Sequence, residues 1–388
     1  PVTRGVIGVH HGQIVLIDDA FTPQCPYGIG QNTVRFNATG CLVAPGLVDP
    51  HTHIVFGGER SHEYAMRANG RSYLEIAQAG GGILSTVKAT RAASVDDLIE
   101  SALPRLDRLL ACGVTTAEVK SGYGLSVEAE LKMLEVIRTL DGRHPIDLIP
   151  TFLGAHTIPP EYRADREAYV RLVIDDMLPR VAQAGLAEFC DVFVEESAFT
   201  IEEAERILMA GRAFGLQPKL HADQLTAGEG AELAGRVGAV SADHLEFISP
   251  AGIQALLDHQ VVAVLLPGAS LFLGANEDAP ARRMIDAGIQ VALATDCNPG
   301  TCMTTNLQLM LTLGMSRLKM SPAEVLTAVT HTAAQAIGRG HRSGRLAVGR
   351  AADIAVFDVP SHVHLPYYFG VPLTKAVFKA GHLVYSDS

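Results

Sequence analysis

The feature that most constrains the fold is a repeated alternation of short apolar runs with longer segments of helical periodicity. Runs rich in Val, Ile and Leu occur at eight places, which are 47–53, 114–120, 147–155, 189–195, 217–222, 239–245, 261–266 and 290–296. Short buried strands that alternate with helices are typical of parallel sheets built from βα units. Eight units over roughly 250 residues or more predict an α/β fold, a (β/α)8 TIM barrel.

Several of the intervening segments carry the periodicity of helices, as at 94–113, 126–142, 200–215 and 321–338. The last segment begins with Ser321 at the N-cap position, Pro322 in the first turn and Glu324 three residues after the cap. A hydroxyl at the cap and a carboxylate three residues later satisfy the free amides of a helix start. We therefore expect a helix to begin at Ser321 and to occupy that segment.

The two ends of the chain do not follow the barrel pattern. Residues 1–46 contain "GVIGVHHGQIVLID", and residues 344–388 contain "GRLAVGRAADIAVFDV" and "KAVFKAGHLVYSD". This alternation of apolar and polar residues predicts antiparallel strands with one buried face. We expect the two ends to pair into one small β-sandwich, with the barrel occupying 47–343. The alternative is that each end forms an independent ragged tail.

The composition of the chain disfavours nucleic-acid and membrane partners and indicates a reducing compartment. The formal net charge of −11 and the isoelectric point near 5.7 disfavour a nucleic-acid partner, so an anionic ligand would need a specific local cation. Six scattered cysteines without a C-x-x-C pair are typical of a reduced cytoplasmic protein. The most apolar stretch, "VVAVLLPGASLFLGA", is broken by Pro267 and Gly268, so we expect no membrane partner.

Polar residues stand where seven of the eight predicted strands end. In a barrel of parallel strands these carboxyl ends and the loops that follow them carry the chemistry. A random scatter of titratable residues would not favour these positions. The residues concerned are His51, His53, Glu118, Lys120, Tyr123, His156, Glu195, Glu196, His221, Asp223, Gln224, Asp243, His244, Glu246, Asp296, Asn298 and Thr301.

Four of these residues form a candidate metal site. His51 and His53 are two residues apart on one strand, so their side chains point the same way. His221 and Asp296 can join them from the fifth and eighth strands. Three imidazoles and one carboxylate suit a borderline divalent ion such as Zn²⁺ or Fe²⁺ and leave a position for water. Each histidine considered alone is better interpreted as a core or loop residue, and only the four residues together favour a metal site.

Several motifs resemble those of the amidohydrolase superfamily, namely "PGLVDPHTH", "LHAD", "DH", "TDCNPG" and "GRLAVGRAADIAVFD". Longer motifs are similar to one family within it, the imidazolonepropionases of histidine degradation. These are "HTHIVFGGERSHEYAMR", "GGGILSTVKATR", "KSGYGL", "TFLGAH", "KLHADQ" and "TDCNPGT". The resemblance covers nearly the whole chain. It implies metal-dependent hydrolysis of the cyclic amide bond of 4-imidazolone-5-propanoate, with N-formimidoyl-L-glutamate as the product.

The resemblance also implies roles for individual residues. It implies that His51, His53, His221 and Asp296 bind the metal, that Asp296, His244 and Gln224 take part in catalysis, and that the substrate contacts are Arg60, Tyr123, His156, Gln224, Asn298, Gly300 and Thr301. The binuclear branch of the superfamily uses a carboxylated lysine, usually on the fourth strand, but "EFCDVFVEE" has none. We therefore expect one divalent metal per chain, zinc (Zn²⁺) or iron (Fe²⁺ or Fe³⁺). Glu195 as a bridge to a second ion is the alternative.

Three of these roles have open alternatives. Gln224 stands where some relatives carry Glu, and an amide can bind substrate but cannot shuttle a proton at neutral pH. Proton transfer would then fall to Asp296 or His244, unless His244 only orients a metal ligand. Arg60 could grip a substrate carboxylate or pair with a nearby acid on the surface. Tyr123 could cover the substrate or simply occupy a turn.

Competing functions follow from the same resemblance. One is another cyclic amide hydrolase or a nucleobase-type deaminase. Gln224 disfavours the deaminase, because such enzymes typically need Glu at that position. The other is a non-enzymatic barrel scaffold, which would typically have lost the metal ligands. For the substrate we expect a small molecule with a carboxylate, and for the protein a cytoplasmic homodimer. Relatives usually begin before Pro1, so we expect part of the first β segment to precede this numbering.

Overall fold

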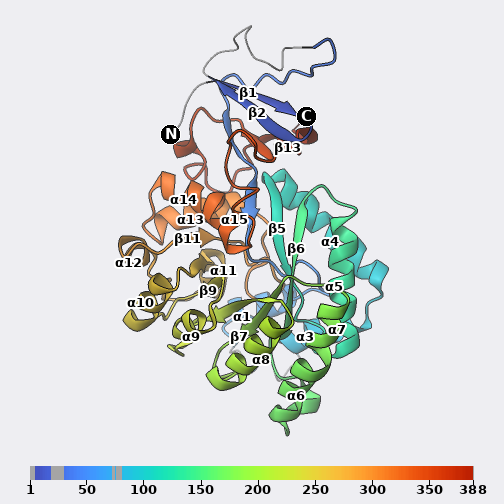
Figure 1. The fold of residues 1–388 in the computed structure, drawn as a ribbon. Coiled ribbons are helices and arrows are strands. Elements are labelled where there is room, and N and C mark those ends of the chain that lie inside the picture. Colours follow the sequence, from blue (N-terminus) through green and yellow to red (C-terminus); the bar gives the residue numbers. More distant parts are fainter. Residues whose placement is uncertain (1–4, 19–29, 72–74, 76–80, 388) are drawn as a thin grey trace.

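The computed structural model describes residues 5–18, 30–71, 75 and 81–387. Cys25 and parts of the predicted N-terminal β segment lie outside these residues. In Figure 1 the barrel forms the large lower body of the molecule. The strands β1, β2 and β13, which come from opposite ends of the chain, lie together above it.

An eight-stranded sheet of parallel strands forms the barrel, in the hydrogen-bonded order β11-β10-β9-β8-β7-β6-β5-β4. Each of the eight predicted runs contains one strand, so the prediction of the barrel is confirmed. The strands are β4 (Leu47–Asp49), β5 (Val114–Lys120), β6 (Asp147–Ala155), β7 (Phe189–Phe193), β8 (Gln217–Ala222), β9 (Ser241–His244), β10 (Val262–Leu265) and β11 (Val291–Leu293).

The first and last strands meet through the segments that follow them. β4 ends before Pro50, which has no amide hydrogen to continue a ladder. Beyond it, the amide of His53 donates to the carbonyl of Cys297 at 3.0 Å, and the amide of Asp296 donates to the carbonyl of His51 at 3.1 Å. Closure of the sheet at its carboxyl end therefore brings residues 51–53 beside residue 296.

Helices cover the outside of the sheet and bury their apolar faces against it. They are α1 (Ser61–Ala68), α3 (Ile83–Ala92), α4 (Val95–Ala111), α5 (Val127–Asp141), α6 (Arg166–Leu172), α7 (Leu178–Gln183), α8 (Ile201–Ala213), α9 (Gly230–Val237), α10 (Pro250–Asp258), α11 (Pro267–Leu273), α12 (Ala281–Asp286), α13 (Leu307–Ser316), α14 (Pro322–Ala328) and α15 (His331–Ala336). Three single turns add to these: the 3-10 turns Pro160–Tyr162 and His362–His364 and the π turn Val173–Met177.

The predicted helix start at Ser321 is confirmed, but the helix does not occupy the whole segment. Ser321 and Glu324 form the reciprocal capping box, with backbone-to-side-chain distances of 3.3 and 2.7 Å. The helix α14 then ends at Ala328, and α15 begins at His331. The carbonyl of Val329 instead accepts a hydrogen bond from the amide of Val48 in β4 at 2.8 Å. A contact with a distant strand thus interrupts the helix.

The two chain ends share one β unit, as expected. A four-stranded antiparallel sheet has the order β14-β13-β12-β3, and β1 and β2 form a hairpin. The strands are β1 (Val6–His10), β2 (Gln13–Asp18), β3 (Leu42–Pro45), β12 (Ile354–Phe357), β13 (Thr374–Lys379) and β14 (His382–Ser386). β3 pairs with β12 over four residue pairs, and the amide of Gly349 donates to the carbonyl of Ile14 at 2.8 Å. The domain boundaries after residue 46 and before residue 344 stay a prediction.

No helix in the described part of the chain combines the length and the apolar character that crossing a membrane requires.

Candidate active site

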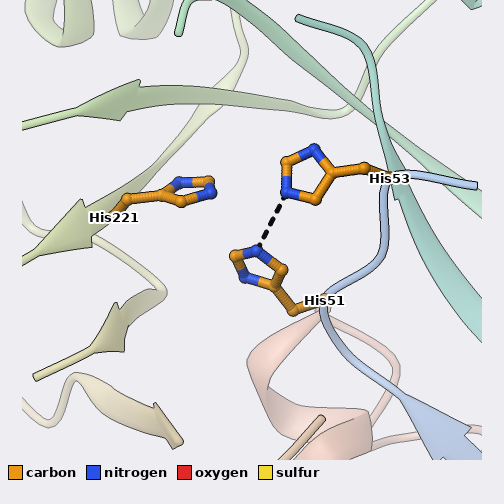
Figure 2. Close-up of side chains that lie close together, drawn as sticks. All are labelled: His51, His53 and His221. Carbon is orange, nitrogen blue, oxygen red and sulfur yellow. Dashed lines mark hydrogen bonds between the residues drawn. The ribbon is translucent and has the colours of Figure 1, made fainter. Parts of the chain in front are cut away.

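Three histidine side chains converge at the carboxyl end of the barrel. His51 and His53 follow β4, and their Nε2 atoms lie 3.2 Å apart. His221, on β8, directs its ring toward them from the opposite side (Figure 2). The three rings each offer one nitrogen within 4.8 Å of the others, and the residues are at most 3% exposed. Asp296 Oδ1 lies 3.5 Å from Nε2 of His51 and 3.7 Å from Nε2 of His53, so the four predicted ligands lie together.

Hydrogen bonds orient two of these rings. Nδ1 of His51 donates to Asp243 at 2.6 Å, and Nδ1 of His221 donates to Asp191 at 3.1 Å. A proton fixed on Nδ1 leaves the lone pair on Nε2, which is the arrangement of metal-ligating histidines. The Nε2 atom of His221 is buried and has no hydrogen-bond partner among the described residues. Such an orphaned acceptor needs an explanation, and a metal ion provides one.

Burial keeps the rings of His51 and His53 uncharged. It lowers the pKa of His51 and of His53 well below the ordinary value, and neighbouring positive groups add to the effect. Neutral imidazoles are the form that binds metal. The donor set of three nitrogens and a carboxylate therefore fits a divalent metal.

Beneath the histidines lies a fully buried layer of five charged residues, which are Glu118, Lys120, Asp191, Lys219 and Asp243. Nζ of Lys120 lies 2.7 Å from Asp191, 3.0 Å from Glu118 and 3.4 Å from Asp243. Nζ of Lys219 donates to Glu118 at 2.6 Å. One ammonium group thus contacts both carboxylates that orient His51 and His221.

The charges of this layer stabilise one another. Burial alone would raise the pKa of Asp243, but Lys219 and Lys120 hold it below its ordinary value. Burial would likewise lower the pKa of Lys120, but Asp191, Glu118 and Asp243 raise it. Lys120 and Asp243 are therefore held in their charged forms, and a charged Asp243 is able to accept from His51.

Glu118, Lys120 and Asp243 stand at predicted strand ends, where the sequence indicates no role for them, and Asp191 and Lys219 are not among the predicted site residues. Lys219 lies two positions before His221, and Asp191 lies four positions before Glu195, so each is an even number of residues from the polar end of its predicted run. The signal was present as a charged residue inside an otherwise apolar run. Such residues point into the barrel, where a charge needs a partner.

Asp296 lies at the start of a tightly bonded loop. Its backbone has a positive φ of 52°, and burial raises the pKa of its carboxyl to about 7. Oδ1 of Asn298 accepts from the amides of Gly300 and Thr301, each at 2.8 Å, and its Nδ2 donates to the carbonyl of Asp296 at 2.8 Å. Thr301 Oγ1 donates to the carboxylate of Asp296 at 3.3 Å. The Asn298 amide therefore organises the loop that presents Asp296.

Arg60 was predicted either to bind a substrate carboxylate or to pair with a nearby acid, and its surroundings agree in part with each role. Its Nε and Nη2 donate to Glu63 at 2.9 and 2.8 Å, which is the expected pairing with a nearby acid. Its side chain is only 14% exposed, and a Cβ at Gly300 would collide with its Nη1. Arg67 donates to the carbonyl of Gly300 at 3.0 Å. Two guanidinium groups therefore lie against the loop that follows Asp296.

Tyr123 and His156 pack directly on the histidine cluster. The ring of His156 stacks on His53 with centroids 5.3 Å apart and an interplanar angle of 16°. Tyr123 is 4% exposed, and its ring centroid lies 5.9 Å from that of His53. Nδ1 of His156 donates to the carbonyl of Gly122 at 3.0 Å, and burial lowers its pKa to about 3. Both side chains thus lie over the candidate metal site rather than on the surface.

A buried carboxylate outside the predicted site residues holds the loop of Tyr123. Glu130 in α5 accepts from the amides of Gly122, Gly124 and Leu125 at 2.8–3.0 Å. Gly122 has a φ of 104°, and a Cβ there would lie 2.9 Å from Nδ1 of His156. The turn is therefore fixed by one acid and by the missing side chain of a glycine.

His244 borders the cluster, whereas Gln224 lies three residues after His221, beyond the end of β8. The ring centroid of His244 lies 5.3 Å from that of His221 and 5.5 Å from that of His51, and burial lowers its pKa well below the ordinary value. Gln224 is half-buried, and its side chain makes no hydrogen bond to any other described residue. Gln224 is thus free to meet a ligand.

Two acids at predicted strand ends have local structural partners instead. Asp223 accepts from the amides of Gly228, Gly230 and Ala231 at 3.0–3.1 Å, where α9 begins. Glu195 accepts from the amides of Leu225 and Thr226 and from the hydroxyl of Thr226. Neither acid belongs to a group of described residues whose donor atoms could hold an ion.

Comparisons with known proteins agree with this geometry. The family model described as "Amidohydrolase family" matches residues 175–384. An imidazolonepropionase of Myxococcus xanthus is 52% identical over 384 residues, which is 99% of this chain and 90% of that protein. An imidazolonepropionase of Geobacillus kaustophilus is 49% identical over 388 residues, which is 100% of this chain and 91% of that protein.

The fold is also found among solved structures. A 5-methylcytosine deaminase of Klebsiella pneumoniae superposes with a TM-score of 0.74 at 15% identity, over 98% of this chain and 95% of the other. At this identity the likeness concerns the fold alone. Family membership rests instead on the relatives at about 50% identity over the whole chain. The chain belongs to the amidohydrolase family and, within it, to the imidazolonepropionases.

Proposed function

We propose that this chain hydrolyses the cyclic amide bond of 4-imidazolone-5-propanoate and releases N-formimidoyl-L-glutamate. Full-length relatives of about 50% identity carry the name imidazolonepropionase. The observation that carries the proposal is the buried cluster of three histidine nitrogens with the carboxylate of Asp296. Such a cluster has the composition of a hydrolytic metal centre.

We propose that His51, His53, His221 and Asp296 hold one divalent metal, zinc or iron. The orphaned Nε2 of His221 and the neutral imidazoles support this assignment. A second group, His51 with Glu118 and Asp243, also has donor atoms close together. Lys120 and Lys219 already contact these carboxylates, so we assign no ion there. When bound, the metal supplies Lewis acidity and lowers the pKa of a water from about 15.7 toward about 7.

The chain's own residues would then complete the hydrolysis. Asp296 would accept the proton of the attacking water, because its carboxylate lies beside the histidine nitrogens that would hold the metal. His244 would donate a hydrogen bond to the carbonyl oxygen as negative charge develops there. As the ring opens, the leaving nitrogen needs a proton, which Gln224 cannot supply.

Arg60 would bind the propanoate carboxylate of the substrate. Nε and Nη2 of Arg60 already donate to Glu63, which holds the guanidinium in one orientation. Its Nη1 lies against Gly300, where no side chain blocks the approach. Charge-assisted hydrogen bonds of this kind are about twice as strong as neutral ones. Tyr123, His156, Gln224, Asn298, Gly300 and Thr301 would surround the rest of the substrate.

One assay separates this function from its rivals. Ring opening of imidazolonepropanoate abolishes its ultraviolet absorbance, whereas a deaminase would release ammonia from an aminated ring. We expect the purified protein to consume imidazolonepropanoate with no ammonia release from cytosine-type rings. A non-enzymatic scaffold would do neither. The Klebsiella protein is named a deaminase, but the likeness to it concerns the fold alone. Position 224 is Gln in this chain, whereas such deaminases typically need Glu there.

We further propose that the protein acts in the cytoplasm as a homodimer. The scattered cysteines without C-x-x-C pairs support a reducing compartment. Light scattering after size-exclusion chromatography tests the dimer, which would have twice the chain mass of 41.2 kDa.

A further inference from the structure

An acid next to the candidate site has no role in the proposed mechanism. Glu246 follows the end of β9, two residues after His244. His244 and Leu245 between them have φ values of 82° and 71°, a conformation that residues other than glycine rarely adopt. The amides of Leu245 and Phe247 anchor the turn by donating to the carbonyls of Ala222 and Asp223 at 3.0 and 2.8 Å. Strained backbone of this kind clusters at functional sites.

This turn directs two unsatisfied polar atoms toward each other. Nδ1 of His244 lies 3.9 Å from Oε2 of Glu246, and the two side chains are 2% and 7% exposed. Neither atom has a hydrogen-bond partner among the described residues. Buried polar atoms without partners are rare, and here a shift of about 1 Å would satisfy both. The other oxygen of Glu246 already accepts from Ser270 in α11 at 3.1 Å.

The protonation states of the two groups are complementary. Burial raises the pKa of Glu246 to about 8, and the negative charges of Asp296 and Asp278 add to the rise, whereas the hydrogen bond from Ser270 opposes it. Burial lowers the pKa of His244. The titratable groups that face Glu246 are therefore His244, Asp296 and Asp278. Two buried acceptor atoms that face each other without other partners are both satisfied when one proton lies between them, and the raised pKa of Glu246 places that proton on its carboxyl group.

We propose that Glu246 is a positioning residue that acts through His244 and supplies the proton that the leaving ring nitrogen takes up. The proposal rests on the proposed function. The carboxyl O–H of Glu246 donates to Nδ1 of His244, which keeps the imidazole proton on Nε2, toward the substrate. Glu246 thus takes the place of the acid that is missing at Gln224.

The proton transfers balance. As the carbon–nitrogen bond breaks, its electron pair stays on nitrogen, which takes the proton from Nε2 of His244. Nδ1 of His244 takes the proton of Glu246, which becomes a carboxylate. The attacking water meanwhile has given one proton to Asp296. That proton returns to Glu246 through solvent when the product leaves, so both acids regain their starting states.

The variant Glu246→Gln tests the relay because its amide can still donate to Nδ1 but has no proton to transfer. We expect kcat with imidazolonepropanoate to fall about 100-fold, as is typical when a general acid is lost. We expect KM and the metal content per chain to stay within twofold. In the parent enzyme kcat should fall as the pH rises past about 8, because Glu246 then loses its proton. This decline should vanish in the variant.

Two further variants sharpen the test. Ser270→Ala removes the hydrogen bond that favours the carboxylate, so the alkaline decline of kcat should move to higher pH, with kcat near pH 7 retained. Glu196→Gln changes an exposed acid at the end of another strand and should leave the profile unchanged.

Three results would overturn the relay. These are a Glu246→Gln enzyme with kcat within threefold of the parent, one that keeps the alkaline decline, and one that loses metal together with activity. If the parent protein does not consume imidazolonepropanoate at all, the proposed function fails instead, which is a separate outcome.

Discussion

At the scale of residues, the candidate site depends on which ring nitrogen of each histidine carries the proton. Asp243 and Asp191 fix the protons of His51 and His221 on Nδ1, and the Nε2 atoms are left for a ligand. Lys120 contacts both carboxylates from below. The orientation of the histidines thus depends on a lysine that does not reach the metal site itself.

Replacing Lys120 with Met should weaken metal binding. The variant keeps the length of the side chain but removes the charge that balances Asp191 and Asp243, so either acid can take up a proton and stop orienting its histidine. Loss of such outer partners typically costs 10–100-fold in metal affinity. Competition with a chelator would measure the change.

The matched control for this variant is Lys379→Met. Lys379 contacts Asp353 and Asp147 at 2.8 Å, far from the histidines in the sheet of the small β unit. Its loss should lower stability without changing metal affinity. An unchanged affinity in Lys120→Met would contradict the role given to the buried layer.

Arg60→Ala should raise KM for imidazolonepropanoate about 10–100-fold, the equivalent of the roughly 1.5–3 kcal/mol expected for a hydrogen bond to a charged group. Metal content should stay near that of the parent, because Arg60 contacts Glu63 and the Gly300 loop rather than the histidines. Steady-state kinetics with metal analysis checks both. Arg206→Ala, which breaks an exposed pair with Glu167, is the control. An unchanged KM would mean that Arg60 does not bind the carboxylate.

At the scale of elements, the pattern of strands could be predicted because strands buried on both faces appear as short apolar runs. The polar strand ends could be predicted because a barrel gathers them at one face. The break between α14 and α15 could not, because it depends on a hydrogen bond from Val48, distant in sequence. Glu130 also escaped prediction, since nothing local indicates that an acid on a helix will bind the turn before it.

Glu130→Ala tests how much the Tyr123 turn depends on this acid. Three buried amides would lose their acceptor, which should lower the free energy of unfolding by roughly 2 kcal/mol or more. Because Tyr123 and Gly122 contact His53 and His156, KM should also rise while metal stays bound. Denaturant unfolding and kinetics measure the two effects. Glu128→Ala, on the same helix, should change neither, and full activity and stability in Glu130→Ala would refute the assignment.

At the scale of the whole molecule, the candidate ligands come from both sides of the barrel seam. His51 and His53 follow the first strand, Asp296 follows the last, and His221 lies on β8 across the barrel. A metal bound by all four would therefore hold the closure of the sheet. This candidate site is also where segments that are far apart in sequence come together, and a barrel that gathers its strand ends at one face makes such a grouping predictable.

Removing the metal should destabilise the entire barrel. A ligand that binds only the folded state stabilises it by about 4 kcal/mol at a thousandfold excess over Kd. We expect a chelator to lower Tm, and added Zn²⁺ or Fe²⁺ to restore it. Elemental analysis would confirm that the chelator has removed the metal. An unchanged Tm after that removal would contradict a metal at the seam.

The most direct test of the central claim is elemental analysis of the purified protein and of its His221→Ala variant, paired with turnover of imidazolonepropanoate. We expect about one zinc or iron per chain in the parent, and joint loss of metal and activity in the variant. A parent protein that is free of metal yet fully active would contradict the account.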